Sequence, residues 1–481
     1  MPTAFREGIL IDDVLLVAVL AAPHDRPRFL WQSVCIMVLT VLFMQAVCLG
    51  QSMADLSIST EDWSQSDVTV APVLPQQSEP CQIHLRVHNH GPADARNVGL
   101  RLVVEPPSAS DPWISELRLE SVPAQASIVD VVQFKPDTNG LHKVTVTIDP
   151  EDALPETNDD NTAALTFPVV RRNVLILYHA NSNEPLMRMR YQTHVTYGGG
   201  RDERTYWTRR GVRPLLHRMG APSRSNLASV EERVAYWAES GEDLIVDELI
   251  NGNGDESVLM ARAFQAFNEQ YPHIWLAVWC SPSPLGSYHK GLRYADAVLP
   301  EVYLRHEDEY RDSDWHLSAD RHAGFADRAF ITLAIDSRKG KDNDGRVTPR
   351  WSSDRAEIER QIRSLRTARP EMMGAALYGN FAEENLIAEA DDLFRRYWIM
   401  PVLTLRQKAD SKIVTLHNIG AIDARDVVVV GDGGSGNWRN TLPVLEAGTS
   451  WELTVPDGVQ HVDIEPSATV TLLNGSHTVI D

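Results

Sequence analysis

Cysteine is scarce in this sequence. The 481 residues contain 4 cysteines, of which Cys35 and Cys48 fall in a strongly apolar N-terminal stretch. The other two, Cys81 and Cys280, are far apart in the chain, so no disulfide framework is predicted. No CxxC pair or cysteine–histidine cluster accompanies them. The sequence therefore predicts no metal site, and it gives no sign of a bound cofactor.

Several motifs of large enzyme classes are also missing. The chain has no P-loop, GxSxG or HExxH pattern, which argues against P-loop nucleotide hydrolases, α/β-hydrolases and zinc proteases. No GxGxxG follows a predicted strand, and the glycine run 198–200 has neither a predicted strand before it nor a predicted helix after it. A dinucleotide-binding fold is therefore not expected.

The chain has fewer positively charged residues than negatively charged ones. The 45 lysines and arginines stand against 66 aspartates and glutamates, which gives a formal net charge of -21. A field of this sign repels phosphate backbones and anionic lipids. We therefore expect no nucleic-acid partner, whereas neutral ligands such as uncharged sugars remain compatible with the charge.

The N-terminus has the pattern of an export signal. Residues 34–50 carry no charge and are mostly apolar, Arg26 and Arg28 precede them, and Ser52-Met53-Ala54 is a small-x-small cleavage pattern. Residues 1–54 are interpreted as a leader with either a signal peptide cut after Ala54 or an uncleaved membrane anchor. The protein is therefore expected to be bacterial and secreted, periplasmic or bound to the cell envelope, with membrane contact only through such an anchor.

A chain of this length exceeds the size at which a single core stops growing, about 250–300 residues, so several domains are expected. Residues 55–170 and 401–481 contain short segments that alternate apolar and polar residues, with turn residues between them and no helical stretch. This pattern predicts an antiparallel β-sandwich at each end of the folded chain. The clearest segments are 82–87, 98–104 and 142–148 in the first module and 412–416, 426–430 and 469–473 in the second.

The two β modules share a motif. Residues 88–98 align without gaps on residues 417–427, with Asn, Gly, Asp, Ala and Val at the same offsets. Such a repeat predicts the same fold for both modules, in which a strand ends, a glycine permits the turn and the next strand begins.

The first module resembles the bacterial cell-adhesion-related domain, CARDB, which is an immunoglobulin-like family. The resemblance lies in the N-x-G-x-x-x-A turn from Asn89 to Ala95 and in the acidic hairpin from Leu154 to Asn161. It implies an extracellular spacer or adhesion module without catalysis, through which a cell-surface partner could be bound.

Residues 171–400 change in style to apolar strands that alternate with amphipathic helices, the signature of a parallel sheet. The predicted strands are 173–179, 243–249, 274–280, 297–304, 329–336 and 374–380, with a weaker one at 211–216 and an unassigned stretch at 191–199. The predicted helices are 230–239, 257–271, 354–368 and 385–397. This count favours a (β/α)8 TIM barrel over an open sheet, so the fold class is a central α/β barrel flanked by two all-β immunoglobulin-like sandwiches.

Chemistry in such a barrel is expected where the strands end, at its C-terminal face. Polar and aromatic residues stand at these ends: His179, Asn181, Asp247, Glu248, Trp279, Glu301, Tyr303, Asp336, Tyr378 and Asn380. Carboxylates that converge among aromatic rings are what glycosidic-bond cleavage requires. The domain resembles the (β/α)8 glycoside hydrolases in this pattern, without a diagnostic family motif.

The resemblance implies an acid/base residue near the end of the fourth strand, where Glu248 stands in an Asp-Glu pair in place of the family's common Asn-Glu. The second carboxylate is expected to be Glu301 or Asp336, with Glu301 ranked ahead because Tyr303 follows it on the same strand face. Simple solvation or helix capping is the alternative role for either of the two.

The substrate-binding candidates are the remaining strand-end residues: His179, Asn181, Asp247, Trp279, Tyr303, Tyr378 and Asn380. A hydrogen-bonded structural histidine is the alternative interpretation of His179. The leading hypothesis is an extracellular glycoside hydrolase acting on a polysaccharide or glycan without a cofactor. The alternative is a noncatalytic surface protein that binds glycan or mediates adhesion, which would not need two carboxylates about 5–10 Å apart.

Overall fold

The computed structural model describes most of the chain beyond the leader. The described residues are 53–108, 110–155, 161–179, 189–219, 229–247, 255–280, 291–301, 328–336, 339–341, 347–349, 354–381, 384–407, 411–433, 438–465, 467, 469–474 and 477–478. Residues 1–52 of the predicted leader lie outside them, whereas Met53 and Ala54 are described and Ala54 is buried in the core of the first β module. Among the described residues, no helix combines the length and the apolar character needed to cross a membrane.

The N-terminal module consists of two antiparallel four-stranded sheets that share one core. One sheet contains β1 (Leu56–Ser57), β2 (Val68–Ala71), β3 (Cys81–Asn89) and β6 (Ala126–Phe134). The other contains β4 (Ala95–Glu105), β5 (Trp113–Val122), β7 (Gly140–Ile148) and β8 (Thr162–Val169). Buried residues alternate with exposed ones along β3 and β4, so the period of two in the sequence does mark the core-facing side.

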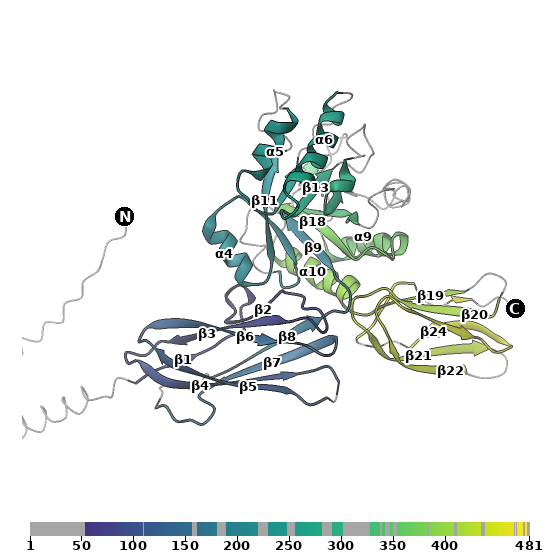
Figure 1. Ribbon diagram of the computed structural model, residues 1–481. Coiled ribbons are helices and arrows are strands. Elements are labelled where there is room, and N and C mark those ends of the chain that lie inside the picture. The colour runs from purple at the N-terminus through teal and green to yellow at the C-terminus, as the bar shows by residue number, and fades with distance from the viewer. Residues whose placement is uncertain are drawn as a thin grey trace, which may run out of the picture.

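The C-terminal module also has two sheets around one core. Its strands are β19 (Val402–Gln407), β20 (Ile413–Asn418), β23 (Ser450–Thr454) and β25 (Thr471–Leu472) in one sheet, and β21 (Ala424–Gly433), β22 (Trp438–Leu445), β24 (Val459–Ile464) and β26 (His477–Thr478) in the other. Figure 1 shows this module beside the N-terminal one, with the central domain above both.

The repeated motif forms the same hydrogen bonds in both modules. The Asn89 side chain donates to the carbonyls of Ala93 and Val122 and accepts from the N–H of Gly91. Its counterpart makes the same set: Asn418 donates to Ile422 and Leu445 and accepts from Gly420. A Cβ at either glycine would overlap a backbone carbonyl oxygen, which explains why both turns need glycine. The predicted correspondence of the two turns is therefore confirmed.

The central domain is built on an eight-stranded parallel sheet that is nearly closed into a barrel. Its strands are β9 (Leu175–His179), β10 (His194–Tyr197), β11 (Arg213–Met219), β12 (Leu244–Asp247), β13 (Leu276–Cys280), β14 (Ala297–Pro300), β15 (Thr332–Asp336) and β18 (Gly374–Phe381). They follow one another around the ring in chain order, and β18 pairs with β9. Two isolated parallel bridges, Val298 to Ala329 and Glu301 to Thr332, join the β14 and β15 sides. The stretch 243–249 therefore contains the fourth strand, as predicted.

One sequence prediction was wrong. The glycine run 198–200 follows β10 and precedes helix α4 (Arg201–Arg209), so it does connect a strand to a helix. β10 has only four residues, which is too short for a clear alternation in sequence. Gly199 has a φ of +101°, a conformation that glycine adopts without strain.

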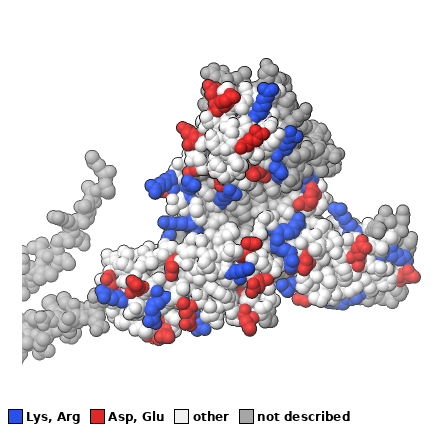
Figure 2. Space-filling view, viewed as in Figure 1, with Lys and Arg blue, Asp and Glu red and all other residues white. Residues whose placement is uncertain are grey.

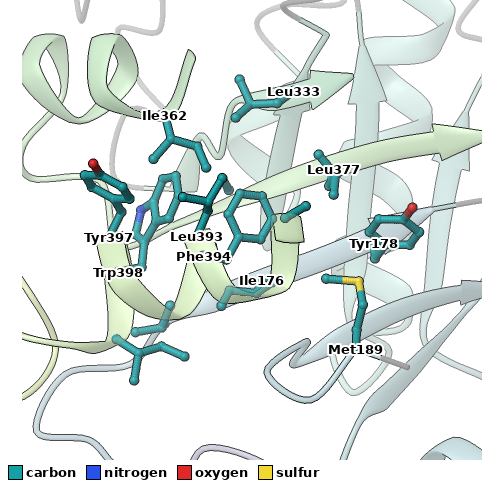
Figure 3. Close-up of a cluster of buried hydrophobic side chains, with 14 of the residues drawn as sticks. Ile176, Tyr178, Met189, Leu333, Ile362, Leu377, Leu393, Phe394, Tyr397 and Trp398 are labelled. Carbon is teal, nitrogen blue, oxygen red and sulfur yellow. The ribbon is translucent and has the colours of Figure 1, made fainter. Parts of the chain in front are cut away.

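Helices cover the outer face of the sheet. They are α5 (Val230–Ala238), α6 (Asp255–Gln270), α9 (Arg355–Ala368) and α10 (Glu384–Phe394), the last continuing as a π-helical turn, η6 (Arg395–Ile399). Short 3-10 turns lie at η1 (Trp63–Gln65) and η3 (Leu292–Tyr294), and β16 (Lys339–Lys341) pairs with β17 (Val347–Pro349). Figure 3 shows how Leu393, Phe394 and Trp398 pack against strand residues such as Ile176 and Leu377.

The three parts meet at one buried carboxylate. Asp423 of the C-terminal module accepts hydrogen bonds from the Arg171 guanidinium (2.9 and 3.0 Å), the Asn139 amide (2.9 Å) and the backbone N–H of Ala447 (2.8 Å). Asn139 belongs to the N-terminal module, and Arg171 lies in the connection that leads into the barrel. Burial alone would raise the pKa of Asp423, but the hydrogen bonds from Arg171 and Asn139 outweigh it and lower that pKa.

Removing this carboxylate should destabilise the assembly. We expect Asp423→Ala to lower the free energy of unfolding by about 3 kcal/mol, the lower end for a broken buried ion pair, because Arg171 remains partly solvated. The matched control is Asp94→Ala, the same position of the repeat, which is exposed and accepts only the N–H of Ala124 in the described structure; it should cost about 1 kcal/mol or less. Urea titrations at pH 7 measure both.

The acid dependence gives a second readout of the same variant. Because the folded pKa of Asp423 is lowered, its contribution is present above the unfolded value and is lost as the pH falls below about 4. The difference in stability between wild type and Asp423→Ala should therefore shrink as the pH is lowered through that range. Equal losses for the Asp94 and Asp423 variants at pH 7 would show that the junction does not depend on this carboxylate.

Candidate active site

The carboxyl ends of the parallel strands bring polar and aromatic side chains to one pole of the barrel. Inside the barrel, alternate residues such as Leu177, Leu215, Ile245 and Ala277 form a buried layer. The next inward-facing position on each of these strands lies two residues further along the chain. These positions are occupied by His179, His217, Asp247 and Trp279.

Three aromatic rings pack against one another at this pole. His179 stacks on Tyr378 with ring centroids 5.5 Å apart, and Trp279 meets the edge of His179 at 5.5 Å. Trp279 and Tyr378 lie 6.3 Å apart at a steep angle. The rings come from β9, β13 and β18, which are distant in sequence, and form one aromatic cluster in which Trp279 is 3% exposed.

His179 is held in its neutral form. Its Nδ1 is hydrogen bonded to the hydroxyl of Thr196, and its ring centroid lies 5.4 Å from that of His217. Burial and the nearby His217 lower the pKa of His179 to about 4, although Asp247 acts in the opposite direction. At neutral pH the ring can therefore exchange hydrogen bonds with a ligand without carrying charge.

His217 and Thr196 were not among the predicted site residues. The Nε2 of His217 lies 3.1 Å from Oδ2 of Asp247, and because a carboxylate only accepts, this nitrogen carries the proton. His217 lies one residue past the weak predicted strand 211–216, whereas β11 extends to Met219. Leu215 faces the interior of the barrel, so the residue two positions further along the strand, His217, is expected to face the same way. Thr196 lies on β10, whose four residues are too few to show a clear alternation in sequence.

Two carboxylates of the described chain stand on either side of β13. Asp247 ends β12, and Glu301 follows β14, where its backbone N–H bonds the carbonyl of Cys280. Neighbouring strands lie about 4.8 Å apart, and Glu301 is two residues further along than Leu299, which is level with Asp247, so the two backbones are about 12 Å apart across β13. Glu301 also contributes, after burial, to raising the pKa of the Cys280 thiol, which places its charge close to that strand end.

The predicted site residues divide into those that the structure brings together and those it does not describe. His179, Asp247, Trp279 and Tyr378 form one cluster, with Glu301 at the same pole. Asp336 and Asn380 stand in β15 and β18, but their side chains lie outside the described part of the structure. Three further candidates, Asn181, Glu248 and Tyr303, lie outside the described residues altogether. No group of three or more His, Cys, Asp or Glu in the described ranges is arranged to hold a metal ion.

The protonation of His179 can be measured directly. We expect its imidazole to stay neutral down to about pH 4 in a nuclear magnetic resonance titration of labelled histidines, with assignment by His179→Gln. Because this folded pKa is below the unfolded value, the histidine's contribution to stability is lost as the pH falls from about 6.5 towards 4. A midpoint near 6.5 for His179 would contradict the buried, neutral ring.

Comparisons with known proteins identify the N-terminal module. Residues 53–165 match the family model of CARDB, as the sequence resemblance implied. No curated protein matches the chain in sequence. Among solved structures, the CARDB domain of a Pyrococcus furiosus protein, in complex with di-metal ions, is 16% identical, covers 24% of this chain and 90% of its own, and has a TM-score of 0.20.

Two further structures extend the comparison. A domain of a putative cell-surface protein from Methanosarcina acetivorans is 20% identical over 25% of this chain and 96% of its own, with a TM-score of 0.19. A β-glucuronidase from Bacteroides uniformis aligns with 87% of this chain at 9% identity and a TM-score of 0.34, and the aligned part spans 63% of that enzyme. The function of the central domain is therefore argued from its own strands and side chains.

Proposed function

We propose that the protein is an extracellular glycoside hydrolase that cleaves glycosidic bonds in a polysaccharide or glycan at the C-terminal pole of the barrel. In this proposal the central domain is a (β/α)8 barrel, and both flanking modules are immunoglobulin-like spacers or binding modules of a secreted, periplasmic or envelope-bound bacterial protein. The leader-like N-terminus and the CARDB module support that location.

The observation that carries the proposal is the combination of an aromatic lining with carboxylates on two sides. His179, Trp279 and Tyr378 offer ring surfaces, and Asp247 and Glu301 stand across β13 from each other. Glycosidic cleavage uses two carboxyl groups roughly 5–10 Å apart on opposite sides of the bond. The proposed acid, Glu248, follows Asp247 in the sequence, and the ends of β12 and β14 lie two strands apart, a span that converging side chains can reduce to that separation.

The roles follow from what each group can do. Glu248, the residue that follows Asp247 in the sequence, would protonate the glycosidic oxygen as the C–O bond breaks. Glu301 or Asp336 would stabilise or attack the anomeric carbon, and a water molecule would complete hydrolysis. Asp247, held by His217, and the neutral His179 would bind sugar hydroxyls, while Trp279 and Tyr378 would stack on the ring faces. Asn181, Tyr303 and Asn380 are proposed as further substrate contacts.

The test is a hydrolysis screen on a panel of soluble and insoluble glycans. We expect Glu248→Gln and Glu301→Gln each to lower kcat by at least about a hundredfold, since general acid–base assistance alone is worth that much. Comparing the loss of kcat in Asp336→Asn with that in Glu301→Gln shows which of the two residues is the second carboxylate. Trp279→Ala should act mainly through KM, because it removes stacking and leaves the proton transfers in place.

The control is Glu269→Gln on the exposed surface of α6, where the carboxylate accepts a hydrogen bond from Gln265. It makes the same chemical change far from the strand ends and should leave turnover unchanged. If wild type binds glycans but releases no sugar from any of them, the noncatalytic binding protein becomes the better account. Equal activity in wild type and Glu248→Gln would remove the acid/base assignment.

A further inference from the structure

The opposite pole of the barrel contains a cavity, at the amino ends of the strands. It has a volume of about 560 Å³, and its walls include His194, Arg213, Trp275, Asp296 and Phe330. A neighbouring pocket of about 520 Å³ shares His194 and Arg213 and reaches Leu74 and Gln76 of the N-terminal module. The two pockets form one groove where the barrel meets that module, which lies directly beneath the barrel in Figure 1.

In Figure 2, blue and red side chains are interspersed along the visible boundary between the barrel and the module beneath it. The chemistry of a ligand must therefore be inferred from the individual groups that line the cavity.

One ring nitrogen of His194 is hydrogen bonded within the protein. The hydroxyl of Thr193, which also contacts the backbone N–H (2.9 Å) and carbonyl (3.2 Å) of Ile176, lies 2.8 Å from His194 Nδ1. The Nε2 of His194 has no hydrogen-bonding partner among the described residues. In the neutral ring this nitrogen accepts or donates a hydrogen bond according to the tautomer.

The environment of His194 keeps it in this form. Its ring stacks on Trp275 at 4.8 Å, and the guanidinium of Arg213 lies over the same indole at 5.3 Å. Burial first, and then the charge of Arg213, lower the pKa of His194 to about 3. The same guanidinium repels a cation, so a neutral group that can donate or accept a hydrogen bond suits Nε2.

Other groups in the cavity also have unused hydrogen-bonding capacity. Arg213 uses its Nε for Asp243 (2.6 Å), and in the described part of the chain its two terminal nitrogens donate to no acceptor. Asp296 uses Oδ2 for the N–H of Leu276, which leaves Oδ1 as an acceptor. The Asn173 side chain, also in the wall, makes no hydrogen bond to the described residues. An anion would meet Asp243 and Asp296, so a ligand without charge fits best.

We propose that this groove is a second binding site, for a neutral, hydroxyl-rich ligand of the glycosyl class. Hydroxyl groups both donate and accept, as the mixture of His194, Asp296 and Arg213 requires, and the apolar walls at Phe330 and Trp275 suit the carbon faces of sugar rings. That the ligand is a glycan rests on the proposed function; that it is a neutral hydroxyl compound rests on the groove alone.

The two poles are separate sites. Trp279 lies in β13 and Trp275 directly precedes that strand, and four residues of extended chain span about 13 Å. The buried layer of Leu177, Leu215 and Ile245 lies between them inside the barrel. A polymer bound at the amino-end groove would stay near the protein between cleavage events at the other pole, which raises its effective concentration.

The test measures binding of neutral oligosaccharides by calorimetry, with cello-, xylo-, manno- and malto-oligosaccharides as probes. His194→Phe keeps a ring on Trp275 but removes the hydrogen-bonding Nε2. It should weaken binding at this groove at least about fivefold, which is the change in Kd expected from the loss of one hydrogen bond. His194→Gln restores an acceptor at a similar reach and should bind within about twofold of wild type. Asn173→Ala, an exposed change, should weaken binding without any effect on folding.

All binding experiments are repeated in a Trp279→Ala background, which weakens the site at the other pole. Loss of binding in His194→Phe with retention in His194→Gln supports the groove, even if no variant hydrolyses any glycan, in which case only the proposed hydrolase fails. Unchanged binding in both His194→Phe and Asn173→Ala would contradict the proposed binding site in the groove, whether or not hydrolysis is seen. The groove is equally overturned if no oligosaccharide of the panel binds in the Trp279→Ala background.

Discussion

The arrangement of parallel strands decides what this protein can do. In a parallel ring every strand points the same way, and side chains alternate between the inside and the outside, so the inward residues near the strand ends must share one pole. This constraint brings together His179, His217, Asp247 and Trp279, which are separated by up to a hundred residues in the chain. It equally assembles His194, Arg213 and Trp275 at the other pole, because the same alternation holds at the amino ends of the strands.

Much of this arrangement was predictable from local pattern. Strands such as β9 and β13 are runs of apolar residues buried on both faces, and the aromatic or polar residue that ends each of them was visible in sequence as a break in the run. His179, Trp279 and Tyr378 were recognised in this way. What could not be predicted was pairing: the hydrogen bond between His217 and Asp247 depends on the stagger of β11 against β12, and no local pattern encodes a stagger.

The shortest strand shows the limit most clearly. β10 has four residues and carries both Thr196, which holds His179, and His194, which lines the second groove. Its sequence gives no alternation long enough to detect, and the glycine run after it was interpreted as lacking a strand for the same reason. Val195, Thr196 and Tyr197 favour extended backbone, but the strand is too short to be recognised by pattern, and its pairing with β9 and β11 stabilises it.

The repeated turn shows how a duplicated motif acquires a new task. In the N-terminal module Asp94 is exposed and caps the N–H of Ala124, whereas the matching Asp423 is buried and binds Arg171 and Asn139. The same side chain at the same offset thus serves a turn in one copy and joins three parts of the chain in the other. The N-terminal module is thereby held beneath the amino pole of the barrel, where Val73 donates to the carbonyl of Gly211. That contact holds the N-terminal module against the barrel, where the module forms one wall of the groove at His194. The hydrogen bonds of Asp423 and the shape of the groove are therefore linked, because a module that moved away from the barrel would leave the groove open on that side.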